Sequence, residues 1–188
     1  MKTVDQSGVS ALPAVSSADF VQAMGQHVSS VCVITTTHEG KYYGLTATAV
    51  SSVCATPPRL LICVNKSGTT YEKIVASGIF SVNVLTDAQD RIAKAFAGMF
   101  GKDFDRFSLG RWKIMTTGAP TLEGAGAVFD CVLAETSDQF SHSVFFGDVV
   151  GVDSAPRGDT LLYGGRRFRE VRKIIEVAHP DHLETLHF

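Results

Sequence analysis

Two short runs on either side of Pro57 and Pro58 constrain this chain more than any other feature. The run before the prolines, residues 44–56, is dense in small hydroxyl residues, and the run after them, Leu60 to Val64, is continuously apolar. Short apolar runs bounded by turn residues are typical of buried strands, and two prolines stop one strand from running through. The chain therefore contains two strands joined at a corner.

The hydroxyl-rich run carries groups suited to contact with a flat ligand. Small side chains let a ligand approach the backbone closely, and hydroxyls both donate and accept hydrogen bonds. The apolar run ends in Asn65, Lys66 and Ser67, and a lysine among such residues can bind a phosphate. Two simpler interpretations stay open: Ser/Thr-rich strands occur in many β proteins, and residues 65–69 could be an ordinary turn.

The order of these features resembles the flavin-binding core of the short-chain flavin reductases, the reductase components of two-component flavin-dependent monooxygenases. That family has Gly-x-Thr-x-(Thr/Ser)-(Ala/Ser)-x-x-(Ser/Thr)-(Val/Leu), then Pro-Pro, then a strand ending in (Val/Ile)-Asn. The matching positions are Gly44, Thr46, Ala47, Thr48, Ala49, Val50, Ser51, Ser52, Val53, Pro57, Pro58, Val64 and Asn65. The resemblance covers residues 17–171 and implies a homodimer with an FMN-binding split β-barrel of Greek-key type.

The pattern of the whole chain predicts a mainly β domain with a few helices. We expect helices over residues 17–27, 69–77 and 87–97, and strands over 31–37, 42–46, 60–64, 80–85, 127–136, 143–152, 160–163 and 168–171. Because helices do not alternate regularly with strands, a closed antiparallel barrel is favoured over a doubly wound sheet. Residues 1–16 are expected to be a disordered tail, residues 17–171 the domain, and residues 172–188 a C-terminal tail.

Composition and charge argue against several classes of protein. The 188 residues are 45% hydrophobic, which suits one domain with a sizeable core, and the net charge of −2 gives no basic bias toward nucleic acid or an anionic membrane. No apolar run approaches the ~20 residues that span a bilayer, and no signal peptide is recognisable. The four cysteines lack metal-binding spacing. We therefore expect a cytoplasmic protein with free thiols and no metal.

A second candidate site lies at the turn between the two longest predicted strands. The run from His142 to Val149 matches the last eight positions of a flavin reductase motif, Gly-Asp-His-x-x-x-x-Gly-x-Val, whereas Phe140 and Ser141 replace its Gly-Asp. The resemblance implies that His142 lies near the nicotinamide and orients it, as the one catalytic residue predicted here. By itself, a histidine at a turn could equally satisfy local backbone groups.

The segment 161–169 resembles the closing strand pair of the same family, Leu-x-Tyr-x-x-(Gly/Arg)-x-(Tyr/Phe). In the family this pair borders the cleft for the pyridine nucleotide. The resemblance implies that Tyr163 and Phe168 stack on aromatic rings and that Arg166 meets a phosphate. An edge hairpin with solvated arginines is the alternative.

Two shorter stretches resemble family segments near the flavin phosphate. Phe96 and Ala97 match a Phe-Ala pair, and Lys102 begins a short charged run that also contains Arg106. A solvated charge cluster in a loop explains the second stretch equally well.

These features together predict an NAD(P)H-dependent flavin reductase that transfers hydride from NADH or NADPH to FMN or FAD and supplies reduced flavin to a separate flavin-dependent monooxygenase. The cofactor-binding residues implied by the resemblance are Thr46, Ala47, Thr48, Ala49, Ser51, Ser52, Val53, Cys63, Val64, Asn65, Lys66, Ser67, Thr69, Phe96, Ala97, Lys102, Tyr163, Arg166 and Phe168. Neither a Gly-x-Gly-x-x-Gly fingerprint after a strand nor a P-loop or hydrolase motif is present. Two alternatives stay open: a non-catalytic split-barrel module that binds flavin or haem, and an oxidase or oxygenase that keeps its flavin.

Overall fold

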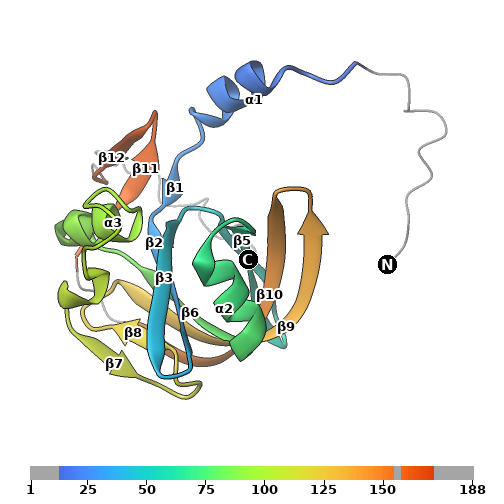
Figure 1. Cartoon of the computed structure of the whole chain (residues 1–188). Helices are drawn as coiled ribbons and strands as arrows, with labels where there is room; N and C mark the ends of the chain where they lie inside the picture. The colour runs from blue at the N-terminus through green and yellow to red at the C-terminus, as the bar shows by residue number, and fades with distance from the viewer. Residues whose placement is uncertain (1–12, 155–157, 172–188) are drawn as a thin grey trace, which may run out of the picture.

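A seven-stranded antiparallel sheet dominates the computed structural model, which describes residues 13–154 and 158–171 (Figure 1). Its strand order is β3-β2-β6-β9-β10-β5-β4. The strands are β2 (Cys32–His38), β3 (Lys41–Ala47), β4 (Val50–Ala55), β5 (Pro58–Asn65), β6 (Ile79–Val84), β9 (Ala127–Gln139) and β10 (His142–Ser154). The chain pairs β5 with the much later β10 and β6 with β9, as in a Greek key. The predicted mainly β split barrel is confirmed.

Two smaller sheets and a few helices complete the described part of the chain. One sheet has the order β1-β11-β12 and the other pairs β7 with β8. Their strands are β1 (Ser29–Ser30), β11 (Leu162–Gly164), β12 (Arg167–Arg169), β7 (Trp112–Ile114) and β8 (Pro120–Leu122). The helices are α1 (Ser17–Met24), α2 (Thr69–Ser77), α3 (Asp90–Phe96) and the short 3-10 turns η1 (Asp87–Gln89) and η2 (Arg106–Ser108). None of these helices is long and apolar enough to cross a membrane.

Strand β2 is buried on both faces because it separates two apolar clusters. Its alternate residues Val33 and Ile34 point to opposite sides. Val33 packs with the buried face of α3, and Ile34 packs with β5, β6 and β10 residues such as Phe80 and Phe145. The β-branched sequence of this strand, in which Thr35 and Thr36 are buried like Val33 and Ile34, reflects its place in the middle of the fold.

The observed elements differ from the predicted ones in several places. Helix α1 ends at Met24, and none of its side chains is buried, so the apolar face that its spacing predicts is exposed. Val75 of α2 is also exposed, although the spacing of Tyr71, Ile74 and Val75 predicts that these side chains face inward. The turn expected over residues 137–142 is shorter, since β9 reaches Gln139 and β10 begins at His142. Strands β7 and β8 were not predicted. The domain limits stay predictions, because residues 1–12 and 172–188 lie outside the described residues.

Candidate functional site

A cleft of about 450 Å³ lies between the end of β3, the end of α3 and the β11–β12 hairpin; we call it the β3–hairpin cleft. It is lined by Val31, Thr46, Ala47, Thr48, Lys94, Ala97, Met99, Tyr163, Arg166, Arg167 and Phe168. Seven of these residues were predicted to bind cofactors, and they come from three distant segments of the chain. The fold thus joins the hydroxyl-rich segment to the aromatic hairpin in one place.

Local interactions hold the walls of this cleft in position. The Thr46 hydroxyl donates to the Ala93 carbonyl oxygen at 2.7 Å, which fixes the end of β3 to α3. Tyr163 and Phe168 are paired across β11 and β12, and their ring centroids lie 5.5 Å apart in an edge-to-face arrangement. The Thr46 hydroxyl therefore has a structural role, since it binds β3 to α3. The hairpin places its aromatic pair at the surface of the cleft.

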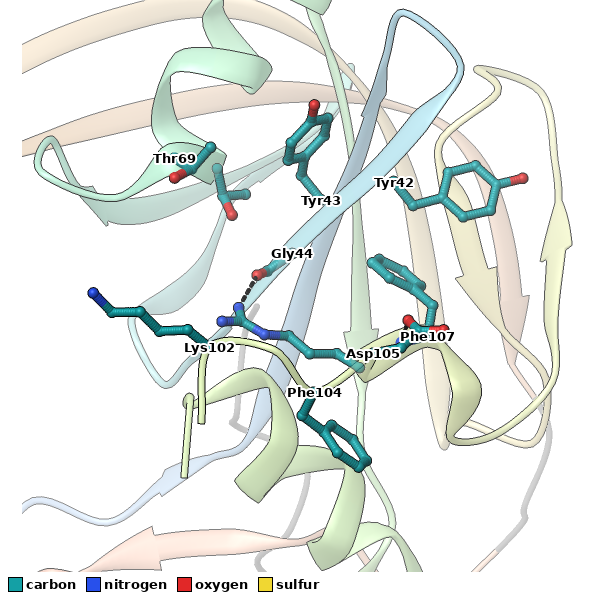
Figure 2. Close-up of a pocket in the computed structure, with 10 residues that line it drawn as sticks. Tyr42, Tyr43, Gly44, Thr69, Lys102, Phe104, Asp105 and Phe107 are labelled. Atoms are coloured by element: carbon teal, nitrogen blue, oxygen red, sulfur yellow. Dashed lines mark hydrogen bonds between the residues drawn. The ribbon is translucent and has the colours of Figure 1, made fainter. Parts of the chain in front are cut away.

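A second cavity, of about 300 Å³, lies at the N-terminus of α2; we call it the α2-terminus cavity (Figure 2). It is lined by Tyr42, Tyr43, Gly44, Thr69, Thr70, Lys102, Phe104, Asp105, Arg106 and Phe107. In Figure 2, Tyr43 lies on the Thr69 side of β3 and Tyr42 on the Phe107 side. Of the predicted site residues, Thr69 and Lys102 meet here.

The α2-terminus cavity has the properties of an anion site. Helix α2 has no side-chain cap at Gly68, so no side chain competes with a ligand for the N–H groups at its start, although the Tyr71 N–H donates to the Gly68 carbonyl oxygen at 3.0 Å. Thr70 is only 6% exposed, and it lines the cavity. Lys102 and Arg106 add two positive charges, and Arg106 Nη1 donates to the Gly44 carbonyl oxygen at 3.3 Å. Asp105 is the one carboxylate among the described residues of the lining.

His142 lies at a third place, the corner where β5 and β10 meet. It is paired with Asn65 in the ladder, and its Nδ1 lies 2.9 Å from the Ser141 hydroxyl. The Lys66 N–H donates to the Ser141 carbonyl oxygen at 2.9 Å. His142 is not among the residues that line the β3–hairpin cleft. Within one chain, the three residues predicted for the nicotinamide, His142 with Tyr163 and Arg166, do not share this cleft.

The polar groups at this corner already have partners. Asn65 Oδ1 accepts hydrogen bonds from the Ser67 N–H and hydroxyl at 2.9 and 2.8 Å. Lys66 Nζ lies 3.5 Å from Asp138 Oδ2, and a hydrogen bond from Ser143, together with the Lys66 charge, holds the pKa of Asp138 below its usual value. A phosphate bound by Lys66 would therefore compete with Asp138.

The hydroxyl-rich strand β4 is the last strand of the seven-stranded sheet, and its residues Ser51, Ser52 and Val53 are exposed. A register shift between Ser52 and Cys54 leaves Val53 outside the regular pairing with β5. An unpaired strand edge offers backbone N–H and C=O groups to a ligand. On the neighbouring strand, Cys63 is partly exposed, and its N–H donates a hydrogen bond to the Ala49 carbonyl oxygen at 3.0 Å.

Two predicted site residues require correction. Val64 is 1% exposed and Phe96 is 2% exposed, and both side chains belong to the core. Alternation along β5 turns Val64 inward, and the inner face of α3 carries Phe96. Only their backbone groups could face a ligand.

Several lining residues were not among the predicted site residues. Lys94 and Met99 line the β3–hairpin cleft because of where α3 lies. Tyr43 and Thr70 line the α2-terminus cavity because α2 approaches β3. Each of these depends on long-range packing, and only the start of α2 has a local signal in the sequence. Among the described residues, no group of three or more His, Cys, Asp and Glu side chains could hold a metal ion.

A split barrel with an aromatic and cationic cleft beside its hydroxyl-rich strands is the architecture that the sequence predicts for a flavin-using oxidoreductase. The chain belongs to the flavin reductase-like family, because the family model of the flavin reductase like domain matches residues 24–172. This confirms the family resemblance and the enzyme class predicted from the sequence.

Curated relatives agree with the assignment to the flavin reductase-like family. The chain is 36% identical over 165 residues to an FMN reductase (NADH) RutF from Ancylobacter novellus, covering 88% of this chain and 91% of the relative. It is 35% identical over 159 residues to the enzyme of the same name from Variovorax paradoxus, covering 85% and 88%.

Solved structures show the same fold. The NADH:FAD oxidoreductase SgcE6 of Streptomyces globisporus superposes with a TM-score of 0.77 at 30% identity, covering 86% of this chain and 99% of that structure. BorF, the flavin reductase component of a bacterial two-component tryptophan halogenase, superposes with a TM-score of 0.76 at 27% identity, covering 85% and 100%.

Proposed function

We propose that this protein is an NADH-dependent FMN reductase that supplies reduced flavin to a separate flavin-dependent monooxygenase. The observation that carries the proposal is the β3–hairpin cleft, in which Thr46 to Thr48 face Tyr163 and Phe168. A flavin-binding strand and an aromatic hairpin in one cleft suit two planar ring systems that must meet.

The names of the relatives support this choice of substrates. The RutF enzymes are named for FMN and NADH, and they match most of this chain. SgcE6 is named for FAD, so FAD is the alternative to FMN, and NADPH is the alternative to NADH; the activity test compares each pair. We propose a partner oxygenase because BorF is titled as one component of a two-component system.

In the proposed mechanism, the protein binds and orients the nicotinamide and the flavin, and the two groups then react with each other. When bound, reduced nicotinamide and flavin supply the hydride transfer from nicotinamide C4 to flavin N5. The aromatic pair Tyr163 and Phe168 orients a ring from one side. The exposed edge of β4 offers backbone N–H groups along Ser51 to Val53 to the charge that develops on the flavin. His142, at the corner beside Asn65, lies outside the β3–hairpin cleft of its own chain, so its proposed role in orienting the nicotinamide depends on the second copy in the homodimer proposed below.

The phosphate end of the flavin belongs in the α2-terminus cavity in this proposal. An uncapped helix N-terminus with Lys102, Arg106 and the Thr70 hydroxyl suits a phosphate dianion. Lys66 and Ser67 precede α2 directly and extend the same anion-binding end. The isoalloxazine ring would then lie farther along β3, toward Thr46 and Thr48.

We also propose a homodimer in the cytoplasm. The outer face of β5 and β10 carries an apolar patch in which Leu61 pairs with Phe146 and Cys63 with Val144, and all four are partly exposed. A second copy would cover such a patch. All four cysteines are free, which suits a reducing compartment. Light scattering at micromolar concentration measures the assembly state, and a fully active monomer would refute the dimer.

The activity test mixes the purified protein with FMN or FAD and with NADH or NADPH, and follows nicotinamide absorbance. We expect oxidation only when flavin is present, and fastest with FMN and NADH. If none of the four pairings gives flavin-dependent oxidation while flavin still binds, the chain is a flavin-binding module and the proposal is wrong. A flavin that stays bound through purification and turnover would instead indicate an oxidase or oxygenase.

A further inference from the structure

We propose that Lys94, Arg166 and Arg167 form a diphosphate-binding end of the β3–hairpin cleft, which binds the nucleotide part of the hydride donor. This inference deepens the proposed function and rests on it. It assigns a role to Lys94, which no sequence motif indicated.

The lining of the cleft is cationic. Among the described residues that line it, three are charged, Lys94, Arg166 and Arg167, and none is a carboxylate. The carboxylates nearby are Asp90, which pairs with Lys94, and Asp87 and Glu170, which line an adjoining cavity together with Arg169, Asp90 and Phe168. The acidic groups thus line the adjoining cavity, and an anion in the cleft meets positive charge.

Lys94 is held at the wall of the cleft by two contacts. Its Nζ lies 2.5 Å from Asp90 Oδ2, one helical turn earlier, and 5.7 Å from the centre of the Phe168 ring. An ammonium group has three N–H donors, and the bond to Asp90 uses one of them. The side chain is therefore ordered before a ligand arrives and keeps donors for it.

Arg166 stands at a place where its backbone conformation is unfavourable. Its φ is +59° and that of Gly165 is +60°, which is the geometry of a type I′ hairpin turn. Asn or Gly is the usual choice there, so a long cationic side chain at this position implies a use that outweighs a small strain. Arg166 and Arg167 both line the cleft from this turn.

In the described part of the chain, the α2-terminus cavity and the β3–hairpin cleft are each lined by a group of cations, and the proposed reaction has two phosphate-bearing substrates. Lys102 and Arg106 lie in the α2-terminus cavity with Gly44, and Lys94 with the hairpin arginines lies in the cleft with Thr46 to Thr48. Both groups border β3. If the flavin phosphate occupies the first group, the second is left for the other nucleotide. Three cations on two separate elements suit an extended diphosphate better than a single phosphate.

The test uses ADP, which carries the diphosphate of NADH without its nicotinamide. With FMN as the flavin, we expect ADP to inhibit competitively against NADH. Lys94→Met should raise the KM for NADH and the inhibition constant of ADP by roughly tenfold each, as expected for one lost charged hydrogen bond. The kcat and the Kd for FMN should change less than about twofold, and Lys94→Arg should restore most of the lost affinity.

Arg91→Met is the matched control, since it removes one positive charge from an exposed position on the same helix. It should change neither ADP inhibition nor the KM for NADH. Thermal melting of each variant shows whether it is folded, and Arg167→Gln supplies a second variant outside the helix if Lys94→Met does not fold.

Two results would overturn the inference. One is ADP inhibition that does not compete with NADH, and the other is a Lys94→Met effect that falls on FMN binding. Calorimetric titration with ADP, in the absence of turnover, separates this inference from the proposed function. If the wild-type protein binds ADP more tightly than Lys94→Met does but has no reductase activity, the diphosphate-binding site is supported and the proposed reductase function is wrong.

Discussion

His142 lies directly opposite Asn65 across the β5–β10 ladder, so two positions from separate sequence motifs meet at one corner of the sheet. The backbone N–H of Lys66 donates to the Ser141 carbonyl oxygen, which closes the corner. The segment around His142 and the end of β5 are thus one structural unit. The Phe140-Ser141 departure from the family pattern is accommodated there: Phe140 takes a positive φ of 50° at the tip of the hairpin.

Replacing His142 distinguishes a role in hydride transfer from a role in the turn. If His142 orients the nicotinamide, His142→Ala should lower kcat/KM for NADH by roughly ten- to a hundredfold, with little change in flavin binding. Steady-state kinetics and flavin titration measure both effects. His38→Ala is the control, because His38 lies on another hairpin beside Glu39. Normal NADH kinetics in a folded His142→Ala protein would move the nicotinamide site to the β3–hairpin cleft alone.

The fold was predictable from the sequence where local patterns and burial agree. The limits of α2 were predicted correctly, since Gly78 ends it with a left-handed φ of 70°. Amphipathic spacing grouped the apolar side chains of α1 on one face, but it could not show whether anything covers them, and none of them is buried. Motif matching singled out Tyr163 and Arg166, which line the β3–hairpin cleft, and Phe96, whose side chain belongs to the core. It did not single out Lys94, because the place of this residue depends on how α3 packs.

The glycine at the start of the flavin pattern has a packing role that can be measured. A Cβ on Gly44 would lie 2.6 Å from Phe96 Cε1 and 2.9 Å from the Ile34 carbonyl oxygen. Gly44→Ala should therefore lower the free energy of unfolding by about 1–3 kcal/mol through overpacking. Urea unfolding checks this, with Gly126→Ala as the control because its nearest atom would be 3.6 Å away. Equal stability of the two variants would show that β3 and α3 can separate freely.

The four thiols should differ in reactivity because they differ in burial. Burial raises the pKa of Cys32 to about 11, and burial with the nearby Asp130 and Asp148 charges raises that of Cys131 to about 12. Cys54 is exposed. Titration with a thiol reagent at pH 8 should label Cys54 rapidly, Cys63 slowly, and Cys32 and Cys131 only after unfolding. Rapid labelling of all four in the native protein would contradict the two-cluster core.

The same shifts predict how stability depends on pH. The folded-state pKa values of Cys32 and Cys131 lie above that of an unfolded cysteine, about 8.5. Their contribution is fully present below that value and is lost as pH rises through the folded values, because the unfolded chain then binds fewer protons. The free energy of unfolding should fall between about pH 8.5 and 11. Cys32→Ala should show a weaker fall over this range, and an unchanged slope would mean that other groups cause it.

Comparing FMN with riboflavin tests the α2-terminus cavity, because the two flavins differ only in the phosphate. Arg106 donates to the Gly44 carbonyl oxygen and lies in the cavity with Lys102 at the uncapped start of α2. If this cavity binds the phosphate, Arg106→Gln and Lys102→Gln should each weaken FMN binding by roughly tenfold and leave riboflavin binding unchanged. Fluorescence titration measures both Kd values.

The control for this comparison is Arg111→Gln, since Arg111 is largely exposed and pairs with Glu123 at 3.1 Å outside the cavity. Raising the salt concentration should weaken FMN binding in the wild-type protein more than in either cavity variant, because fewer charge contacts remain to be screened there. Equal losses for FMN and riboflavin would show that the two side chains support the flavin ring or the fold of the 98–107 loop. The flavin phosphate would then have to lie at Lys66 and Ser67, in competition with Asp138.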